Sequence, residues 1–307
     1  MNYLQQLQSI LKASEWSQEQ LAQKLGVSFA TVNAWLRERS EPRKNALLNI
    51  ERLYLDIVGS ETVDQLQLVA AREAALQHKL SVTGVTKNKP ILDALTLYLT
   101  YHTNTIEGST MTLSDVEDVI FSNKVLSNRT VIEQSEARNH QAALNWVLDC
   151  LQASTQLVID EVFILGIHLR LMNGIVSDAG QYRSHGVRIM GSRTTVANWL
   201  KVPELMTELA MDMNTNDSDV LRLLAKTHAD FEKIHPFSDG NGRTGRLLLL
   251  AMALRSSLMP PIVVKERKYA YYKYLEIAQT KQDYVPLELF LAESVTAAAD
   301  ILNSVAN

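Results

Sequence analysis

The chain has few of the residues that stabilise small secreted folds or mark irregular ones. Its 307 residues include one cysteine, Cys150, so an internal disulfide framework is excluded. Only 7 prolines and 12 glycines are present while 46% of the residues are hydrophobic, which is typical of a largely helical protein of about two domains. Low-complexity tracts and solenoid periods are absent as well.

Long apolar runs and targeting signals are also absent from the sequence. No stretch approaches the roughly 20 apolar residues that cross a bilayer. The N-terminus lacks a basic region followed by an apolar one. We therefore expect no membrane partner and a cytoplasmic location. Cys150 lies in an apolar helical stretch beside Trp146 and Val147, so we expect a buried structural thiol and not a nucleophile.

Against this background, residues 235–246 concentrate chemically active groups in the order His-Pro-Phe-Ser-Asp-Gly-Asn-Gly-Arg-Thr-Gly-Arg. Apolar residues at helical spacing over 221–234 predict a helix. Pro236 ends this helix at His235, because the residue before a proline disfavours helical geometry. A second helix is expected over 243–258. His235 therefore lies at a helix end, and it is the one group of the run that titrates near neutrality.

The start of the second helix predicts an anion site, since the first turn of a helix presents unpaired N–H groups. Gly240 and Gly242 lack a Cβ, so the backbone can adopt positive φ and approach a phosphate closely. Arg243 and Arg246 lie three positions apart on one helical face, so both guanidiniums can reach one phosphate chain. Asp239 is a hard oxygen ligand that suits Mg²⁺ beside substrate phosphates. An ordinary interhelical loop would not need this combination.

The run resembles the motif of the Fic family of AMP-transferring domains, His-x-Phe-x-Asp/Glu-Gly-Asn-Gly-Arg-x-x-Arg, and residues 235–246 match every position. The resemblance extends over roughly residues 91–295. It implies an autoinhibited protein adenylyltransferase that moves AMP from ATP to a Ser, Thr or Tyr hydroxyl of a target protein. Related Doc phosphotransferases alter the glycine and second-arginine region, so the intact run favours nucleotidyl transfer.

The resemblance also implies a role for each motif residue. His235 would be the base that deprotonates the target hydroxyl, and Asp239 would hold Mg²⁺ on the α- and β-phosphates. Arg243 would bind the β-phosphate and Arg246 the γ-phosphate. The anion hole would be formed by the backbone of Gly240, Asn241 and Gly242. Tyr272 lies in a stretch similar to the wall on the adenine side, although core packing explains that tyrosine almost as well.

A second segment, residues 103–108, has the sequence Thr-Asn-Thr-Ile-Glu-Gly and fits the inhibitory pattern of the family, Ser/Thr-x-x-x-Glu-Gly/Asn. The resemblance implies that Glu107 forms a salt bridge with Arg246 and blocks the γ-phosphate, as an arginine–carboxylate pair is among the stronger polar contacts. In some relatives this glutamate positions a water that removes AMP. De-AMPylation and self-modification therefore stay open as further activities.

A third segment, residues 180–192, alternates apolar and polar positions between two glycines, which predicts a short strand or hairpin in an otherwise helical chain. Family members use a β-hairpin flap here. Val187, Arg188 and Ile189 would then dock the target by main-chain pairing at an exposed edge. A hairpin that merely joins two helices is the alternative.

The first 58 residues carry a helix-turn-helix pattern that resembles the Cro/repressor-type module. Its key positions are Gln18, Ala22, Gly26 and Val32. Ser17 and Ser28 are the expected N-caps of its two helices. Phe29, Asn33 and Arg37 would then face the major groove of DNA.

The charge of this module is nearly balanced, with seven Lys/Arg against six Asp/Glu over residues 1–58, a net of +1. Nonspecific attraction to phosphate should therefore be modest and salt-sensitive. DNA is the partner we expect, with protein docking or dimerisation through the same helices as the alternative.

The expected fold class is mainly α, with three parts. Residues 1–58 form the helix-turn-helix domain. Residues 59–90 form a connecting helix followed by a flexible linker from Thr83 to Pro90, and residues 91–307 form the Fic-type domain with its small hairpin. A homodimer is one further expectation from the resemblance. The rival interpretation is a DNA-binding transcriptional regulator whose Fic-like domain senses nucleotide, but a sensor has no need of the base His235.

Overall fold

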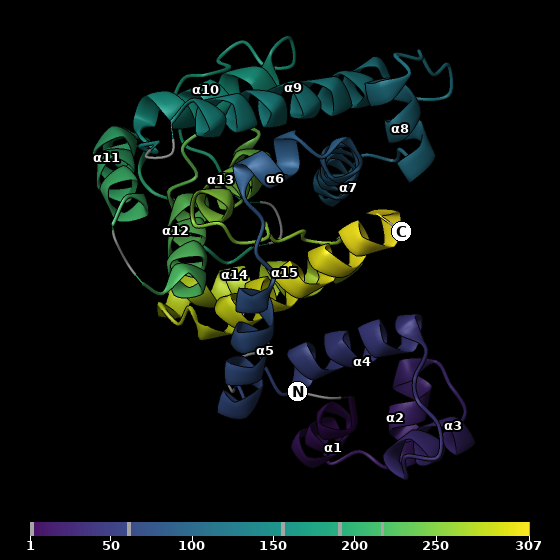
Figure 1. The fold of residues 1–307 in the computed structure, drawn as a ribbon. Helices are drawn as coiled ribbons and strands as arrows, with labels where there is room; N and C mark the ends of the chain where they lie inside the picture. The colour runs from purple at the N-terminus through teal and green to yellow at the C-terminus, as the bar shows by residue number, and fades with distance from the viewer. Residues whose placement is uncertain (1–2, 60–62, 155–156, 190–191, 216–217, 307) are drawn as a thin grey trace.

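The computed structural model describes residues 3–59, 63–154, 157–189, 192–215 and 218–306, and it is almost entirely helical (Figure 1). The N-terminal helices are α1 Tyr3–Ser14, α2 Gln18–Leu25, α3 Phe29–Leu36, α4 Lys44–Ile57, α5 Gln65–Gln77 and α6 Val82–Thr86. The central helices are α7 Lys89–Ile106, α8 Leu113–Phe121, α9 Val131–Ala153, α10 Glu161–Met172 and α11 Val202–Met213, which the short 3-10 helix η1 Trp199–Lys201 precedes. The last are α12 Val220–Ile234, α13 Asn241–Arg255, η2 Lys265–Arg267, α14 Lys268–Lys281 and α15 Val285–Ala306.

Helices α1 to α4 form the helix-turn-helix module, and its local signals act as expected. The Ser17 side chain accepts a hydrogen bond from the N–H of Gln20, and the Gln20 side chain accepts one from the N–H of Ser17, which completes a capping box. Gly26 ends α2 in the left-handed conformation at φ 68°. Ser28 caps α3 through the N–H of Thr31. The predicted caps and turn are confirmed.

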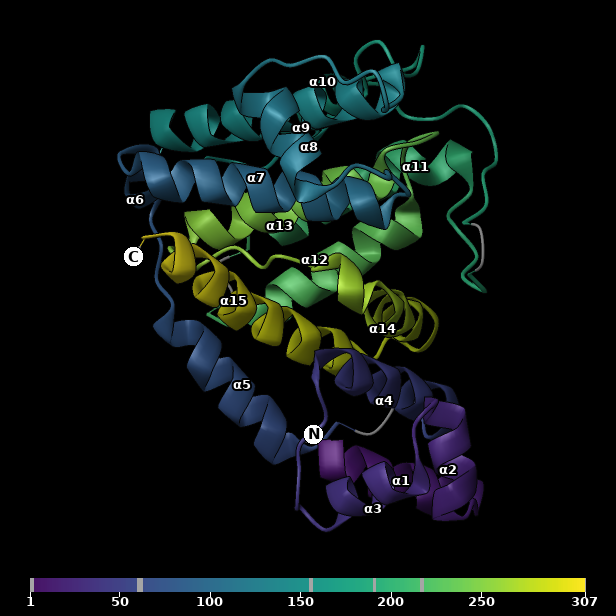
Figure 2. The same cartoon turned by 90° about the vertical axis from the view of Figure 1, so that its right-hand side faces the viewer.

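The module packs against the rest of the chain through α4, which lies on α14 (Figure 2). Arg267, in η2 at the start of α14, forms ion pairs with Glu51 of α4 at 2.6 Å and with Glu293 of α15 at 2.8 Å. Asp56 of α4 accepts a hydrogen bond from the hydroxyl of Tyr269. The two parts of the chain therefore share a charged interface.

The segment expected as a flexible linker is helical, so that prediction is wrong. Ser81 caps α6, accepting from the N–H of Gly84, and α7 begins directly afterwards at Lys89. Asn88 caps α7, and Pro90 lies in the first turn of this helix, where its missing N–H costs nothing. Gly84 and Pro90 indicated a loop, but Ser81 and Asn88 cap the two helices that contain them and so stabilise helical structure here.

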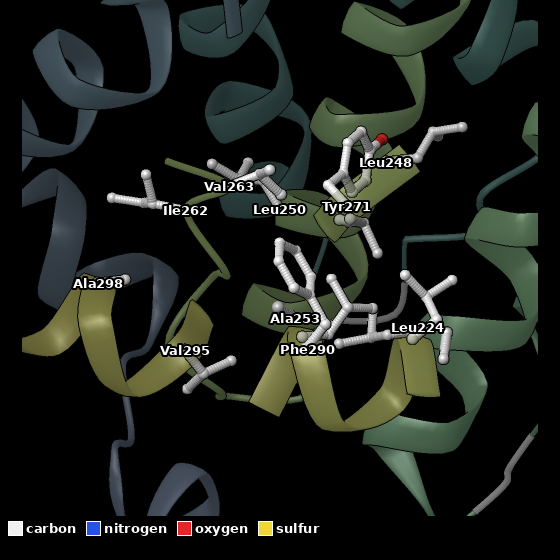
Figure 3. Close-up of a cluster of buried hydrophobic side chains, with 14 of the residues drawn as sticks. Leu224, Leu248, Leu250, Ala253, Ile262, Val263, Tyr271, Phe290, Val295 and Ala298 are labelled. Carbon is white, nitrogen blue, oxygen red and sulfur yellow. The ribbon is translucent and has the colours of Figure 1, made fainter. Parts of the chain in front are cut away.

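Helix α13 runs through the centre of the larger part, between α9 and α10 on one side and α12 and α14 on the other (Figure 1). Every residue from 243 to 254 is buried, as expected for a helix that is apolar on nearly all faces. Leu250 and Ala253, in the C-terminal half of α13, pack in a hydrophobic cluster with Tyr271 and Phe290 (Figure 3). The first turn of α13 is thereby held rigidly at the edge of this core.

The predicted hairpin is not seen. The described residues of this region, 184–189 and 192–198, adopt no regular strand, and Met190 and Gly191 lie outside the described residues. A strand needs a partner for its backbone groups, and the one β-bridge that the described residues form joins Lys79 to Leu258, outside this region.

The structure bears on two further expectations, the lack of membrane-spanning helices and the structural role of Cys150. No helix within the described ranges is long and apolar enough to cross a bilayer. Cys150 is half-buried in α9, and burial raises the pKa of its thiol. A thiol with a raised pKa is a poor nucleophile, so the structural role expected for Cys150 fits its surroundings.

Candidate active site

His235 directly follows α12 and has left-handed backbone geometry, at φ 51° and ψ 62°. Its Nδ1 lies 3.3 Å from the carbonyl oxygen of Glu232. A carbonyl can only accept, so Nδ1 carries the proton and Nε2 is left as a free acceptor. Burial lowers the pKa of His235, and the nearby positive charge of Arg183 adds to this effect, while the Glu232 carbonyl opposes it. The imidazole is therefore a neutral base at neutral pH.

The loop between His235 and α13 is held by the side chain of Asn241. Its Oδ1 accepts from the N–H of Phe237 and its Nδ2 donates to the carbonyl of Phe237, both at 2.9 Å. Gly240 then enters α13 with φ 79°, a left-handed conformation that suits glycine. Asn241 thus shapes the loop with its side chain.

His168 of α10 packs against the same loop. Its ring stacks on Phe237 with centroids 3.6 Å apart, Nδ1 accepts from the N–H of Gly180 at 2.9 Å, and Nε2 lies 3.0 Å from the carbonyl of Asp239. The tautomer is therefore fixed, with the proton on Nε2. Burial lowers the pKa of His168 to about 4, so this histidine stays neutral and structural.

The side chains of Arg246 and Glu107 form an ion pair beside the first turn of α13. Nη2 of Arg246 lies 2.5 Å from Oε1 of Glu107, and Nε donates to Oγ1 of Thr103 at 2.6 Å. A Cβ at Gly242 would clash with the same Oε1 of Glu107. The carboxylate therefore lies against the glycine at the start of the helix, and it occupies the position of an anion there.

Arg243, the other motif arginine, points away from this anion. Its Nη1 lies 2.6 Å from Glu136 of α9, and its Nη2 lies 3.3 Å from Asp239. The side chain is 4% exposed and does not line the cavity in front of the loop. The reach of both guanidiniums to one phosphate chain stays a prediction, which would require Arg243 to turn outward.

A cavity of about 710 Å³ opens in front of the loop, between α7, α14 and the segment after Arg183. The predicted residues that line it are Glu107, Arg188, Ile189, His235, Asp239, Gly240, Asn241, Gly242, Arg246 and Tyr272. Val187 lines a neighbouring depression instead. Phe29, Asn33 and Arg37 belong to α3 and its C-terminus in the separate helix-turn-helix module.

Tyr272 forms part of the wall formed by α14. It is 39% exposed, and its ring lies 5.7 Å from the ammonium group of Lys268. Lys268 in turn donates to the carbonyl of Ile106, directly before Glu107. An aromatic face at the cavity wall provides a surface on which a purine base can stack.

Three charged residues near the loop, the half-buried Glu136 and the buried Arg183 and Glu232, were not singled out from the sequence. Glu136 holds Arg243, Arg183 donates to the carbonyl of His235, and Glu232 lines the cavity beside His235. Burial raises the pKa of Glu232 to about 8, with a further raising effect from Glu107 and a lowering one from Arg246. Glu232 lies three positions before His235, about one helical turn, and this spacing indicated that the two residues could lie close together.

Asp239 is compatible with a bound cation. Its side chain is 61% exposed, and Oδ1 accepts from the N–H of Gly240 at 2.5 Å. No group of three or more ligating side chains occurs in the part of the chain that the structure describes. Mg²⁺ in nucleotide sites takes one or two carboxylates and fills its shell with phosphates and water, so a single carboxylate at the cavity edge fits.

These features define a helical domain with a glycine-lined anion site facing a neutral histidine, and comparison with known proteins identifies its class. Residues 158–253 match the Fic/DOC family, and residues 7–54 match a helix-turn-helix family. The match to the Fic/DOC family thus contains the loop and residues 241–253 of α13, and it follows a match to a helix-turn-helix family at the N-terminus.

The chain is similar to "Protein adenylyltransferase Fic" of Nematostella vectensis, at 32% identity over 212 residues, which cover 65% of this chain and 47% of that protein. "Protein adenylyltransferase fic-1" of Caenorhabditis briggsae is 29% identical over 311 residues, covering 96% of this chain and 57% of the relative. The chain thus spans about half the length of the curated relatives it matches.

Solved structures give the same fold. A Fic family protein from Desulfovibrio desulfuricans G20 superposes with a TM-score of 0.64 at 26% identity, covering 80% of this chain and 76% of that one. Fic-1 from C. elegans has a TM-score of 0.67 at 23% identity, covering 94% of this chain and 85% of that one. The mainly helical Fic fold is confirmed.

Proposed function

We propose that this protein is an autoinhibited protein adenylyltransferase, which transfers AMP from ATP to a Ser, Thr or Tyr hydroxyl of a target protein. The observation that carries the proposal is the carboxylate of Glu107 at the start of α13. It lies against Gly242 and pairs with Arg246, in the same cavity as His235. A site that holds an anion between a helix start and a guanidinium suits a phosphate group.

In the proposed reaction, the hydroxyl oxygen of the target attacks the α-phosphorus of ATP. The bond from that phosphorus to the bridging oxygen breaks, pyrophosphate leaves, and the hydroxyl proton passes to Nε2 of His235. Nε2 is the free acceptor because Nδ1 donates to Glu232. Phosphoryl-type transfer depends mainly on positioning and charge neutralisation, with a base placed at the nucleophile.

The remaining groups bind and orient the nucleotide in this proposal. The first N–H groups of α13, from Asn241 and Gly242, would hold the phosphates, with Arg246 on the γ-phosphate and Arg243 on the β-phosphate. Asp239 would hold Mg²⁺, which neutralises phosphate charge when bound. The Tyr272 ring would stack on adenine. ATP as the substrate also fits a cytoplasmic location.

Labelled ATP tests the proposal directly. The Glu107→Gly variant, incubated with ATP labelled on the α-phosphate and with cell lysate, should transfer label to protein. Adding His235→Ala to this variant should abolish the label, because Ala cannot accept the proton. Equal labelling by both proteins would remove the catalytic claim. Label on the chain itself would identify self-modification, and loss of label from an isolated modified target would identify de-AMPylation.

We also propose that the helix-turn-helix domain binds DNA, as in the rival interpretation of a DNA-binding regulator. Phe29 is 47% exposed at the start of α3, while the Asn33 amide is held by Gln18 at 3.0 Å. Retention of the full chain on genomic DNA fragments should decline steeply with salt and fall in Arg37→Ala. The same retention for both proteins would favour protein docking or a homodimer through these helices.

A further inference from the structure

Arg183 is an internal residue whose guanidinium donates to backbone carbonyls of four residues. The residue is 2% exposed, and burial lowers the pKa of its guanidinium. No ion pair to a carboxylate is formed by it among the described residues. Its charge is balanced instead by carbonyl dipoles, including those at the C-terminal end of α12, where the helix dipole is negative. Such a costly arrangement implies that the contacts have a purpose beyond filling space.

The four acceptors come from three places in the chain: the end of α12, His185 and Ala197. Nε donates to the carbonyl of His235 at 2.7 Å, and Nη2 lies 3.3 Å from that of Ile234. Nη1 donates to His185 at 2.8 Å, and Nη2 also donates to Ala197 at 2.7 Å. Because a guanidinium presents its N–H groups in one rigid plane, it fixes all four carbonyls relative to one another.

Backbone hydrogen bonds reinforce this junction at both ends. The N–H of Arg183 donates to Pro236 at 2.9 Å, and the N–H of Ala197 donates to Lys233 at 3.2 Å. The described residues 184–189 and 192–196 lie between these two anchors in the sequence. Arg188 and Ile189, among them, line the same cavity as His235.

We propose that Arg183 is a positioning residue that locks the backbone of His235 to the carbonyls of His185 and Ala197, so that the base keeps one fixed relation to the segment that docks the target, described at residues 184–189 and 192–196. This inference rests on the proposed function, since it assigns the docking of the target to that segment.

The left-handed backbone of His235 explains why such a lock is needed. A non-glycine residue in this region is less stable than in a helix or strand, and it persists only where its surroundings hold it. The bond from Arg183 to the His235 carbonyl holds that peptide, and the imidazole then reaches the Glu232 carbonyl. A lysine would keep the charge but could not span four carbonyls.

The test uses the full chain with Glu107→Gly as the parent, and adds Arg183→Met or Arg183→Lys. Arg255→Met is the matched control, because Arg255 is another guanidinium with a pKa lowered by burial, and it donates to Leu157, Asn214 and Met213 near the opposite end of α13. Three quantities are measured: the kcat of AMP transfer, the affinity for ATP, and the tautomer of His235 by NMR of ¹⁵N-histidine protein. The His235 signal is the one lost in His235→Ala.

Both Arg183 variants should lower kcat by about 100-fold, the usual cost of misplacing a reacting group by about 1 Å. Affinity for ATP should be unchanged, since Arg183 does not line the cavity. The single Nδ1–H tautomer of His235 should give way to a mixture. Arg255→Met should match the parent in all three respects. A kcat and a tautomer equal to the parent's in either folded Arg183 variant would overturn the inference.

The two proposals fail in different ways. If the parent transfers no AMP, the proposed function fails, while the NMR signal of His235 still decides the role of Arg183. If neither Arg183 variant folds, the parent protein supplies the answer through hydrogen exchange at Nε of Arg183. Slow exchange is expected there, and exchange as fast as that of an exposed arginine would contradict the lock.

Discussion

Oε1 of Glu107 lies 2.5 Å from Nη2 of Arg246 and rests directly over Gly242. The pair joins the end of α7 to α13, and it lies in the part of the cavity where we propose that a phosphate binds. Glu107 is therefore the residue whose removal should have the clearest effect on activity.

Glu107→Gly should raise AMP transfer by about 10- to 100-fold, because a hydrogen bond to a charged group contributes about 1.5–3 kcal/mol. The free Arg246 would then receive the γ-phosphate. Initial rates with labelled ATP measure the effect. Glu133→Gln is the control, as Glu133 accepts from Thr110 and Thr130 on the other side of the inhibitory segment. A rate no higher than wild type would show that Glu107 does not inhibit.

Glu232 should make stability fall as pH rises. Burial raises the pKa of this carboxyl from 4.5 to about 8, so the folded state binds the proton more tightly than the unfolded state. The associated stability is fully present below pH 4.5 and is lost as pH rises through 8. Glu232→Gln removes this dependence and should stabilise the protein at pH 8.5 by an amount on the order of a few kcal/mol.

Urea unfolding of Glu232→Gln at pH 5 and 8.5 measures this change. Glu133 is a control of opposite sign, because hydrogen bonds from Thr110 and Thr130 lower the pKa of its carboxyl to about 2. Glu133→Gln should therefore reduce stability at pH 8.5. An unchanged pH dependence in Glu232→Gln would mean that Glu232 is ionised in the folded protein.

Glu136→Ala should destabilise the protein by up to about 3–5 kcal/mol, the usual effect of leaving a buried charge without its partner. The charge concerned is that of Arg243, which is 4% exposed and keeps only the longer contact to Asp239 at 3.3 Å. Urea unfolding at pH 7 gives the difference. The exposed Glu117 on α8 is the control, and a loss no larger than that of Glu117→Ala would contradict the prediction.

Buried histidines should make the protein acid-labile. Burial lowers the pKa of His140 and His228 to about 3 and that of His168 to about 4, against 6.5 when unfolded. The unfolded state thus binds protons first as pH falls, so stability present above pH 6.5 is lost progressively toward pH 4. His140→Gln should flatten this loss in urea unfolding between pH 7 and 5, while replacing the exposed His185 should not. Equal slopes would exclude His140 as a cause.

The local parts of the structure could be predicted because their signals are contiguous in the sequence. Pro236 ended α12 at the expected residue, and Ser17, Gly26 and Ser28 capped the expected helices. Glu107 meets Arg246 across 139 positions, and only the family pattern connected the two in advance.

The parts that could not be predicted depend on distant backbone partners. Arg183 donates to carbonyls, and carbonyls leave no residue pattern to detect. The partner of Arg243 in this structure, Glu136, lies 107 positions away, and no sequence pattern connected the two. The segment around Val187 alternates like a strand, but alternation cannot supply the second strand that a ladder needs.

The most direct test of the account is the crystal structure of the Glu107→Gly variant with Mg²⁺ and a nonhydrolysable ATP analogue. We expect the γ-phosphate on Arg246, the inner phosphates over the first turn of α13, and the α-phosphorus facing Nε2 of His235. A cavity without nucleotide, or a nucleotide bound with its phosphates away from Gly242, would contradict the central claim.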